Sequence, residues 1–329
     1  MKLLFFTDTH IKGTTPKNRK DNYYETLKRK FNEICDISKE LEVDYILHGG
    51  DWFDRPDISP SIVREFAIIV KSFGKEVYTV AGNHDIYGQN PRTISRTMLG
   101  ILEGTGVVNL LKDDEEVILK RGGVSLQLTG KSYNYDIDGQ DYAKYYMVKK
   151  NSKVDYAINI VHGMLLKKPF YEGIQYTLLE DIKDTEADIT FAGHYHSGFG
   201  IRNINDKYFV NPGSIVRVSN TISEIERKPK IVYIELEDDI EIREIELKSA
   251  LPGEEVLDRE ELEKAKDRSL RLHQFYQSIS QTMEYKKIDI ASIVENIASN
   301  QDLSREVKEE ALRRIAIAQE SFAMGQEIE

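Results

Sequence analysis

The chain has 329 residues, of which 40% are hydrophobic, and a single cysteine, Cys35. This length suits one large α/β domain with an appendage, and one cysteine excludes both an intrachain disulfide and a cysteine-built zinc site. The formal net charge of −11 argues against a protein that coats nucleic acid by bulk electrostatics, but it is compatible with a nuclease that holds its substrate through metals and a local basic patch.

No apolar run approaches the roughly 18 residues that are needed to span a bilayer. A strand-like segment at residues 2–6 leaves no room for a cleavable signal peptide at the N-terminus. We therefore expect a soluble, cytoplasmic protein without a membrane segment.

The first part of the chain alternates strand and helix patterns. We expect strands at residues 3–6, 43–47 and 76–80, and helices at residues 23–41 and 62–73. A β-α-β-α-β order predicts parallel strands that are joined by right-handed crossovers.

After the third strand, the pattern predicts a short helix at residues 93–102 and another near residues 142–148. The other expected elements of this part are strands, at residues 116–119, 125–129, 155–161, 189–192, 199–204, 208–210, 231–236 and 240–247. The strands of the second half predict a further sheet layer, and hence two sheets packed face to face with helices outside.

Residues 251–255 have the Pro-Gly composition of a hinge. Beyond it, residues 262–283 carry an apolar stripe with steps of three and four, as in a coiled coil, and two more helices are expected at residues 290–297 and 304–318. We therefore predict one domain at residues 1–250 and a helical extension at residues 251–329. The extension is a packed cap, a dimer element or a module that docks a partner.

Five strand-like segments are followed by stretches that carry Asp, His or Asn. These stretches are Asp8-Thr9-His10, Gly50-Asp51, Gly82-Asn83-His84-Asp85, His162-Gly163 and Gly193-His194-Tyr195-His196. Taken singly, such residues are more often turn formers or satisfied surface groups. Taken together, they predict a site, because ligands of open α/β sheets bind just past the carboxyl ends of the strands.

The mixture of carboxylate and imidazole side chains suits Mn, Fe or Zn. A hydrolase with one metal needs only three or four of these ligands, so the surplus favours a site with two ions. Two ions about 3.5–4 Å apart can clamp the attacking and leaving oxygens of an in-line phosphoryl displacement. An aspartate is the natural bridge between them, because its carboxylate offers two oxygens.

In this order, the motifs resemble the signature of the calcineurin-like metallophosphoesterases over about residues 1–247. The sequence around the ligands, at residues 47–56 and 81–85, is most similar to that of the SbcD-type nucleases of DNA double-strand-break repair, the meiotic recombination eleven family. The resemblance implies an α/β fold built as a four-layer α/β/β/α sandwich with a helical C-terminal extension.

The resemblance also implies two divalent metal ions, with Mn²⁺ expected and Fe or Zn as alternatives. The implied ligands of one ion are Asp8, His10 and His196. The implied ligands of the other ion are Asn83, His162 and His194, and Asp51 is implied to bridge the two. His84 is implied to contact the scissile phosphate and to help protonate the leaving oxygen, with Asp85 fixing its imidazole. Water activated by the metals is the implied nucleophile, so no covalent protein intermediate is needed.

One position departs from the family pattern. Asp54 stands where some members have a histidine that touches substrate phosphate, and an anionic side chain cannot do the same job. The alternative is that Asp54 orients His84 or a ligand. Arg217, just after the Asn-Pro-Gly-Ser turn at residues 211–214 that is expected to border the site, is a candidate phosphate contact.

Several features keep two interpretations. The basic loop at residues 11–20 is either solvated or a track for the DNA backbone, and the Tyr-rich stretch at residues 133–146 carries the same ambiguity. Trp52 and Phe53 either stack on substrate or pack beneath the site, with packing favoured for Phe53. His48 is expected to point into the sheet.

The predicted function is a Mn-dependent DNA exonuclease and endonuclease that works with an SbcC-like coiled-coil ATPase in repair or recombination. The C-terminal helices would bind that ATPase, and a homodimer is possible. The chain has no Gly-X-X-X-X-Gly-Lys-Ser/Thr loop, so ATP hydrolysis would belong to the partner. The alternatives are a small-molecule phosphodiesterase or phosphatase and a catalytically silent scaffold. The residues after the hinge are too few and too helical to hold both the DNA-capping domain and the docking helices of the family.

Overall fold

The computed structural model describes residues 1–113, 115–171, 173–219, 221–258, 307 and 310. The helices expected within residues 262–318 fall outside this part, apart from residues 307 and 310. The sheets and helices below belong to one compact unit, Met1–Glu261.

The first sheet begins with the expected alternation of strands and helices. Its parallel centre consists of β1 (Lys2–Phe6), β2 (Tyr45–His48) and β3 (Glu76–Thr79), linked by α1 (Tyr23–Glu40) and α2 (Pro60–Ser72). The full strand order is β14-β13-β1-β2-β3-β4. The added strands are β4 (Asn109–Leu110), β13 (Lys230–Leu236) and β14 (Ile240–Glu246).

The second sheet also has six strands, in the order β11-β12-β10-β7-β6-β5. Its inner strands β12, β10, β7 and β6 pair in parallel, so their carboxyl ends meet at one edge. The strands are β5 (Val117–Arg121), β6 (Val124–Lys131), β7 (Tyr156–Gly163), β10 (Ile189–His194), β11 (Gly200–Ile204) and β12 (Lys207–Asn211). Two short strands, β8 (Leu165–Leu166) and β9 (Thr177–Leu178), pair separately.

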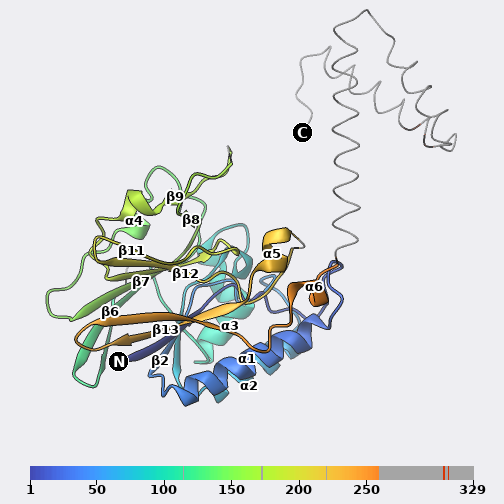
Figure 1. Cartoon of the computed structure of the whole chain (residues 1–329), viewed down its shortest axis with the longest axis horizontal. Coiled ribbons are helices and arrows are strands. Elements are labelled where there is room, and N and C mark those ends of the chain that lie inside the picture. The colour runs from blue at the N-terminus through green and yellow to red at the C-terminus, as the bar shows by residue number, and fades with distance from the viewer. Residues whose placement is uncertain (114, 172, 220, 259–306, 308–309, 311–329) are drawn as a thin grey trace, which may run out of the picture. The chain divides into compact units, whose positions relative to one another are not determined.

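The two sheets pack face to face, and helices cover the first sheet. Phe5 of β1 stacks on Phe191 of β10 with ring centroids 4.2 Å apart, inside an apolar cluster shared by both sheets. The other face of β1 contributes Phe6 to a second cluster with Phe31 of α1 and Phe66 of α2. Figure 1 shows α1 and α2 along the outer side of the first sheet. The predicted α/β fold with two sheets is therefore confirmed.

The outer layer over the second sheet is thin. It contains α4 (Ala143–Tyr146) and the 3-10 helix η3 (Leu179–Ile182), which supply Tyr146 and Ile182 to a third apolar cluster. The remaining short helices of the described chain are η1 (Asn83–Asp85), η2 (Pro91–Arg96), α3 (Met98–Gly104), α5 (Ile222–Glu226) and α6 (Gly253–Val256).

The expectation that all strands of the second half form the further sheet is wrong. The hairpin β13–β14 returns to the first sheet, where Lys2 of β1 lies opposite Glu235 of β13 in antiparallel register. This pairing satisfies the hydrogen-bonding groups of β1 that would otherwise form an open edge.

Two helix predictions also need correction. The expected helix at residues 93–102 is split into η2 and α3, because Thr97 is extended and caps α3 by accepting a hydrogen bond from Gly100 N–H at 3.3 Å. The helix near residues 142–148 is only the single turn α4.

Residues 251–258 do not leave the first unit as a free segment. They form the turn of α6, and Val256 and Leu257 are buried. The division expected at residues 250 and 251 stays a prediction.

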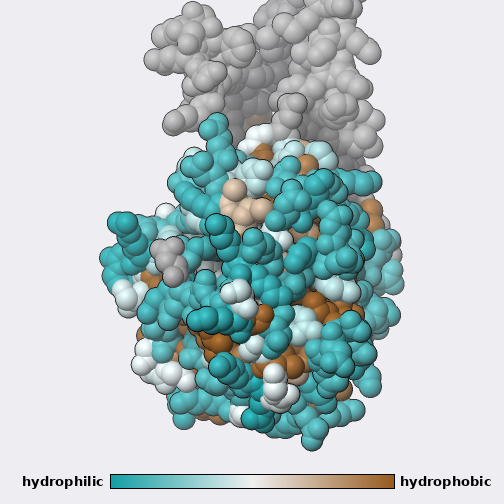
Figure 2. All heavy atoms as spheres, turned by 90° about the vertical axis from the view of Figure 1, so that its left-hand side faces the viewer, coloured by the Kyte–Doolittle hydropathy of each residue, from teal (hydrophilic) through white to brown (hydrophobic). Residues whose placement is uncertain are grey.

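The face of the described unit that Figure 2 shows is mainly hydrophilic. Hydrophobic side chains come to the surface in small areas between hydrophilic ones on the face shown in Figure 2. Within the described residues, no helix combines the length and apolar character that a membrane crossing requires.

Candidate metal centre

The carboxyl ends of β1, β2, β7 and β10 bring the predicted ligands together. Two groups have nitrogen and oxygen atoms within 4.8 Å of one another: Asp8, His10, Asp51 and His196, and Asp51, His162 and His194. Asn83 joins the second group, since its Oδ1 lies 2.9 Å from His194 Nδ1 and 3.3 Å from His162 Nε2. The structure thus gathers all seven predicted ligands, and Asp51 belongs to both groups.

Asp51 presents one oxygen to both groups. Its Oδ1 accepts a hydrogen bond from the backbone N–H of His84 at 2.9 Å. Its buried Oδ2 has no hydrogen-bond partner among the described residues, yet lies 3.4 Å from His162 Nε2 and 3.6 Å from His10 Nε2. A buried carboxylate oxygen without a donor is costly, so this oxygen fits a position between two cations.

The backbone at the site is strained. Asp8, His10, Asp51 and His194 have φ values of 54°, 41°, 55° and 81°, a region that residues other than glycine rarely adopt. Hydrogen bonds between the loops hold this conformation, for example from Asp8 N–H to Gly50 O at 3.1 Å and from His10 N–H to Asp51 O at 3.0 Å. Such strain concentrates at functional sites, where it fixes side-chain positions in advance.

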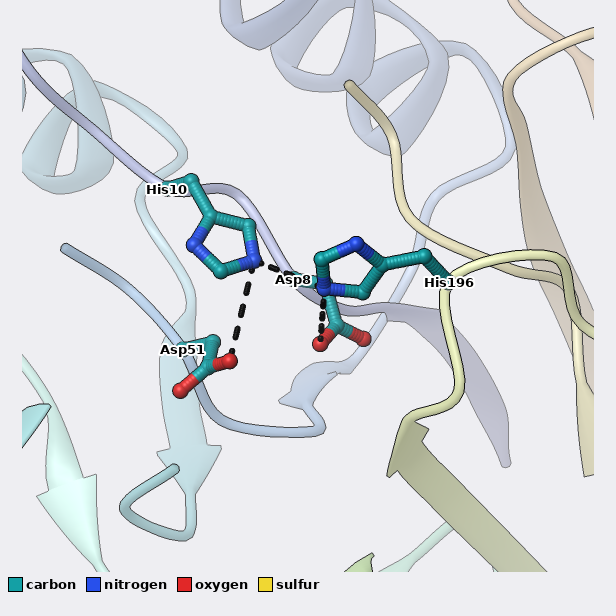
Figure 3. A group of neighbouring side chains, drawn as sticks. All are labelled: Asp8, His10, Asp51 and His196. Atoms are coloured by element: carbon teal, nitrogen blue, oxygen red, sulfur yellow. Dashed lines mark hydrogen bonds and ion pairs between the residues drawn. The ribbon is translucent and has the colours of Figure 1, made fainter. Parts of the chain in front are cut away.

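The first group is shown in Figure 3, where three loops point their side chains at one another. His10 Nε2 lies 2.9 Å from His196 Nε2, which in turn lies 3.5 Å from Asp8 Oδ1. Burial lowers the pKa of His10 to about 3, so its imidazole is neutral. Burial opposes ionisation of Asp8, but the hydrogen bond and charge of His196 hold the pKa of Asp8 below its usual range. A neutral imidazole and an ionised carboxylate are the forms that bind metal.

The second group is oriented by the backbone. His162 Nδ1 lies 2.7 Å from Gly49 O, which makes Nδ1 the donor and directs Nε2 toward Asp51 and Asn83. Burial alone would lower the pKa of His162, but the Asp51 carboxylate raises it to about 9. Burial and the charge of His162 lower the pKa of His194 to about 4. The charge of Asp51 thus acts on the imidazoles of this group.

Asp54, and not Asp85, orients His84. The backbone carbonyl of Asp54 accepts a hydrogen bond from His84 Nδ1 at 2.9 Å. His84 Nε2 is thus left available at the site, where its ring meets that of His10 edge-on with centroids 4.7 Å apart. The prediction that the Asp85 carboxylate fixes this imidazole is wrong.

Asp85 is a positioning residue for the loops. Its carboxylate accepts hydrogen bonds from the backbone N–H groups of Gly82, Trp52 and Phe53 at 2.9, 3.2 and 3.1 Å. Burial, together with the charge of Asp51, raises the pKa of Asp85 to about 7. These bonds join the loop after β2 to the loop after β3, so Asp85 acts on the site through the backbone.

Two glycines permit this close approach of loops. A Cβ atom on Gly82 would lie 2.0 Å from Asp51 Oδ1, and one on Gly50 would lie 2.5 Å from His162 Nδ1. Both glycines occur in the motifs that the sequence singled out, but their steric role appears only when the loops are seen together.

Some expected substrate contacts are structural instead. Arg217 is buried, and its guanidinium donates to the carbonyls of Arg227 and Leu251, so its assignment as a phosphate contact is wrong. Arg19 is likewise buried, where it donates to Asp21 and to Arg217 O, which removes it from a DNA track.

The aromatic residues that follow Asp51, Trp52 and Phe53, are part of the hydrophobic core. Trp52 and Phe53 are fully buried, so the alternative of a stacking surface is wrong for both. His48 stacks on Trp52 with ring centroids 3.9 Å apart inside the core, as expected. The turn at residues 211–214 borders the site as predicted, since Ser214 Oγ donates to Asp8 O at 2.7 Å.

Two contacts beside the site did not emerge from the sequence. The ring of Tyr133 lies 5.3 Å from that of His194, whereas the sequence showed only a Tyr-rich stretch. Lys12 forms an ion pair with Asp54 at 2.9 Å, and no spacing rule links these positions.

Comparison with known proteins agrees with this geometry. The family model for calcineurin-like phosphoesterases matches residues 1–198. The DNA double-strand break repair protein Mre11 of Thermoplasma acidophilum is 29% identical over 123 residues, which are 36% of this chain and 31% of that protein.

Two solved structures are similar to the chain in fold. They are GAP50, the anchor in the inner membrane complex of Plasmodium, at 14% identity and a TM-score of 0.48, and the calcineurin-like phosphoesterase YfkN of Bacillus subtilis, at 13% and 0.46. Each covers 75% of this chain, with 85% and 90% of the respective structures aligned. Because the family model spans more than half of the sequence, from β1 to β10, the chain belongs to the calcineurin-like phosphoesterase family.

Proposed function

We propose that this chain is a metal-dependent DNA exonuclease and endonuclease that hydrolyses phosphodiester bonds with two divalent ions. Membership of a phosphoesterase family supports hydrolysis of a phosphoester. The partial match to Mre11, a DNA double-strand break repair protein, supports DNA as the substrate. The observation that carries the proposal is the unpartnered Oδ2 of Asp51, which faces both groups of imidazoles.

In this proposal, each group holds one ion. Asp8, His10 and His196 hold the first, and Asn83, His162 and His194 hold the second. Asp51, whose Oδ2 lies 3.6 Å from His10 Nε2 and 3.4 Å from His162 Nε2, would contribute to both. When bound, two such ions supply positive charge to the reacting phosphoryl group and lower the pKa of water. A donor set that mixes oxygen and imidazole nitrogen suits Mn, Fe or Zn, and the family resemblance favours Mn²⁺.

His84 is the proposed acid for the leaving oxygen. Its Nδ1 is held by Asp54 O, so Nε2 is the atom that can carry the transferable proton. Asp54 thereby fixes the tautomer and the direction of the ring, which is the role that a hydrogen-bonded orienting group has beside a catalytic histidine.

The decisive assay uses the purified chain with Mn²⁺ on linear and hairpin DNA, with EDTA as the metal-free control. Hydrolysis of DNA that requires Mn²⁺ and is lost in His84→Ala would support the proposal. Hydrolysis of bis(p-nitrophenyl) phosphate or p-nitrophenyl phosphate without any action on DNA would favour a small-molecule phosphodiesterase or phosphatase. Absence of bound metal and of activity would favour a silent scaffold.

Exposed aromatic and basic side chains on a loop that contacts Tyr195 support a nucleic-acid substrate. The segment between β8 and β9 extends away from the sheets (Figure 1) and carries Lys167 and Lys168, both exposed, and Tyr171, which is 75% exposed. The ring of Phe170 contacts those of Tyr171 and Tyr195 at 4.8 and 6.4 Å, and Tyr195 lies between two proposed ligands. Bases of a single strand stack on such rings while lysines attract its phosphates.

Tyr171→Ala should therefore weaken binding of a single-stranded oligonucleotide. Loss of one stacked base costs about 1–3 kcal/mol, which is about 5- to 150-fold in the dissociation constant. Fluorescence anisotropy in EDTA measures this without hydrolysis. Ile118→Ala, an exposed apolar position on β5, is the control and should bind as the unmodified protein does. Equal affinities for all three proteins would remove Tyr171 from the DNA path.

We further propose that the chain acts in the cytoplasm with an SbcC-like coiled-coil ATPase, bound through its C-terminal helices, with a homodimer possible. The Mre11 match supports partnering, and the helices concerned lie outside the described residues. Co-purification with a coiled-coil ATPase that carries a Walker motif, lost when residues 262–329 are deleted, is the test. Full binding without those residues would contradict this docking site.

A further inference from the structure

An ion pair lies at the rim of the candidate metal centre. Lys12 Nζ is 2.9 Å from Asp54 Oδ1, and the two side chains are 17% and 30% exposed. Asp54 also belongs to a third group, in which its carboxylate and ring nitrogens of His10 and His84 lie within 4.8 Å of one another. The pair is therefore next to the proposed acid and is reached from solvent.

This third group is poorly suited to a further cation. Its carboxylate is already paired with Lys12, and His84 Nδ1 donates to the Asp54 carbonyl. The positive charge at this place is thus supplied by the protein itself.

Tyr23 holds the Lys12 side chain in position. Its Nζ lies 5.4 Å from the centroid of the Tyr23 ring, and the Tyr23 hydroxyl donates to His10 O at 2.8 Å. An ammonium has three N–H donors, and Asp54 takes one of them. Lys12 can therefore bind a second anion that arrives from the open side.

We propose that Lys12 binds a phosphate oxygen of the substrate and that Asp54 competes with the substrate for this lysine. The inference rests on the proposed function in so far as the substrate is a phosphodiester. The Asp54 carboxylate repels any phosphate, and it repels a monoester of charge near −2 more than a diester of charge −1. Asp54 would thereby select phosphodiesters over phosphomonoesters.

Opposite effects of two neighbouring substitutions test this inference. Lys12→Ala should weaken binding of inorganic phosphate and raise KM for bis(p-nitrophenyl) phosphate, each on the order of tenfold, as expected for one charge-assisted hydrogen bond. Asp54→Asn should tighten phosphate binding and raise the rate on p-nitrophenyl phosphate relative to that on bis(p-nitrophenyl) phosphate. Lys12→Arg should restore most of the affinity.

Phosphate binding is measured by calorimetry on EDTA-treated protein, which keeps this readout independent of metal loading, and rates are measured with Mn²⁺. Lys150→Ala is the matched control, because Lys150 forms an ion pair with Asp188 at 2.8 Å with side chains 27% and 15% exposed. It should leave both readouts unchanged. Thermal unfolding of each variant shows that the fold is retained.

An ion pair with a purely structural role would give a different result. Lys12→Ala and Asp54→Asn break the same contact, so both would then weaken binding or leave it unchanged, and either outcome overturns the inference. The proposed function is tested separately. If the two variants show the opposite effects but the protein does not cut DNA, the inference about Lys12 and Asp54 holds and DNA is not the substrate. If the protein cuts DNA but both variants change phosphate binding in the same direction, the nuclease function holds and the inference is wrong.

Discussion

Asp51→Asn should lower both the metal content and the rate of hydrolysis. The substitution keeps the shape of the side chain but removes the charge on the oxygen that lies 3.4 Å from His162 Nε2 and 3.6 Å from His10 Nε2. It also places either an amide nitrogen or a neutral oxygen between the two groups. Loss of an outer-shell partner costs about 10–100-fold, so loss of a bridging ligand should exceed about 100-fold in rate.

The measurement is metal content by mass spectrometry after loading with Mn²⁺ and dialysis, alongside initial rates on DNA. Asp155→Asn is a suitable control, because Asp155 stands just before β7, at the opposite end of the strand that carries His162. That variant should keep both ions and the full rate. If Asp51→Asn did the same, the assignment of a site with two ions would be wrong.

The clustering of the site could be predicted because the candidate ligands lie at or just past the carboxyl ends of predicted strands. Asp8, Asp51 and His162 each come at or just past the end of a strand that the sequence pattern also predicts. Within each sheet, parallel strands bring their carboxyl ends to one edge. The two sheets pack face to face, and the residues at the ends of β1 and β2 meet those at the ends of β7 and β10. No knowledge of side-chain conformation was needed for that step.

The roles of the supporting residues could not be predicted in the same way. Asp85 follows His84 in sequence, which suggested that it orients the imidazole, but its carboxylate turns to three backbone N–H groups. Adjacent side chains need not point in the same direction, and backbone donors leave no trace in the sequence. The pair Lys12 and Asp54 is hidden for the same reason.

The pairing partners of the strands could not be predicted from the sequence. The pattern of β13 predicts a strand, and its residues are buried along most of its length. Either sheet could have accepted such a strand, and the pattern contains no signal for the partner. The choice of β1 depends on the long-range register that places Lys2 opposite Glu235, which becomes visible only in the folded chain.

His84→Ala should abolish most hydrolysis of DNA while leaving the metal content intact. The side chain of His84 is the proposed acid, whereas Asp51 Oδ1 is held by the backbone N–H of His84 at 2.9 Å. Alanine keeps that N–H, so the Asp51 carboxylate stays in place. General acid catalysis contributes about 10²–10⁴-fold, and the rate on DNA should fall by that factor.

The leaving group separates an acid from a residue that merely binds. An alkoxide leaving from DNA needs a proton, whereas p-nitrophenolate leaves readily without one, so His84→Ala should harm hydrolysis of bis(p-nitrophenyl) phosphate much less than hydrolysis of DNA. Thr93→Ser is a control for folding, because serine keeps the buried hydroxyl on η2 that bonds with Tyr87 N–H and Asn90 O. An equal loss on both substrates, with both ions retained, would assign His84 to phosphate binding. Loss of the ions would instead mean that the imidazole, and not only the backbone beneath it, holds the centre together.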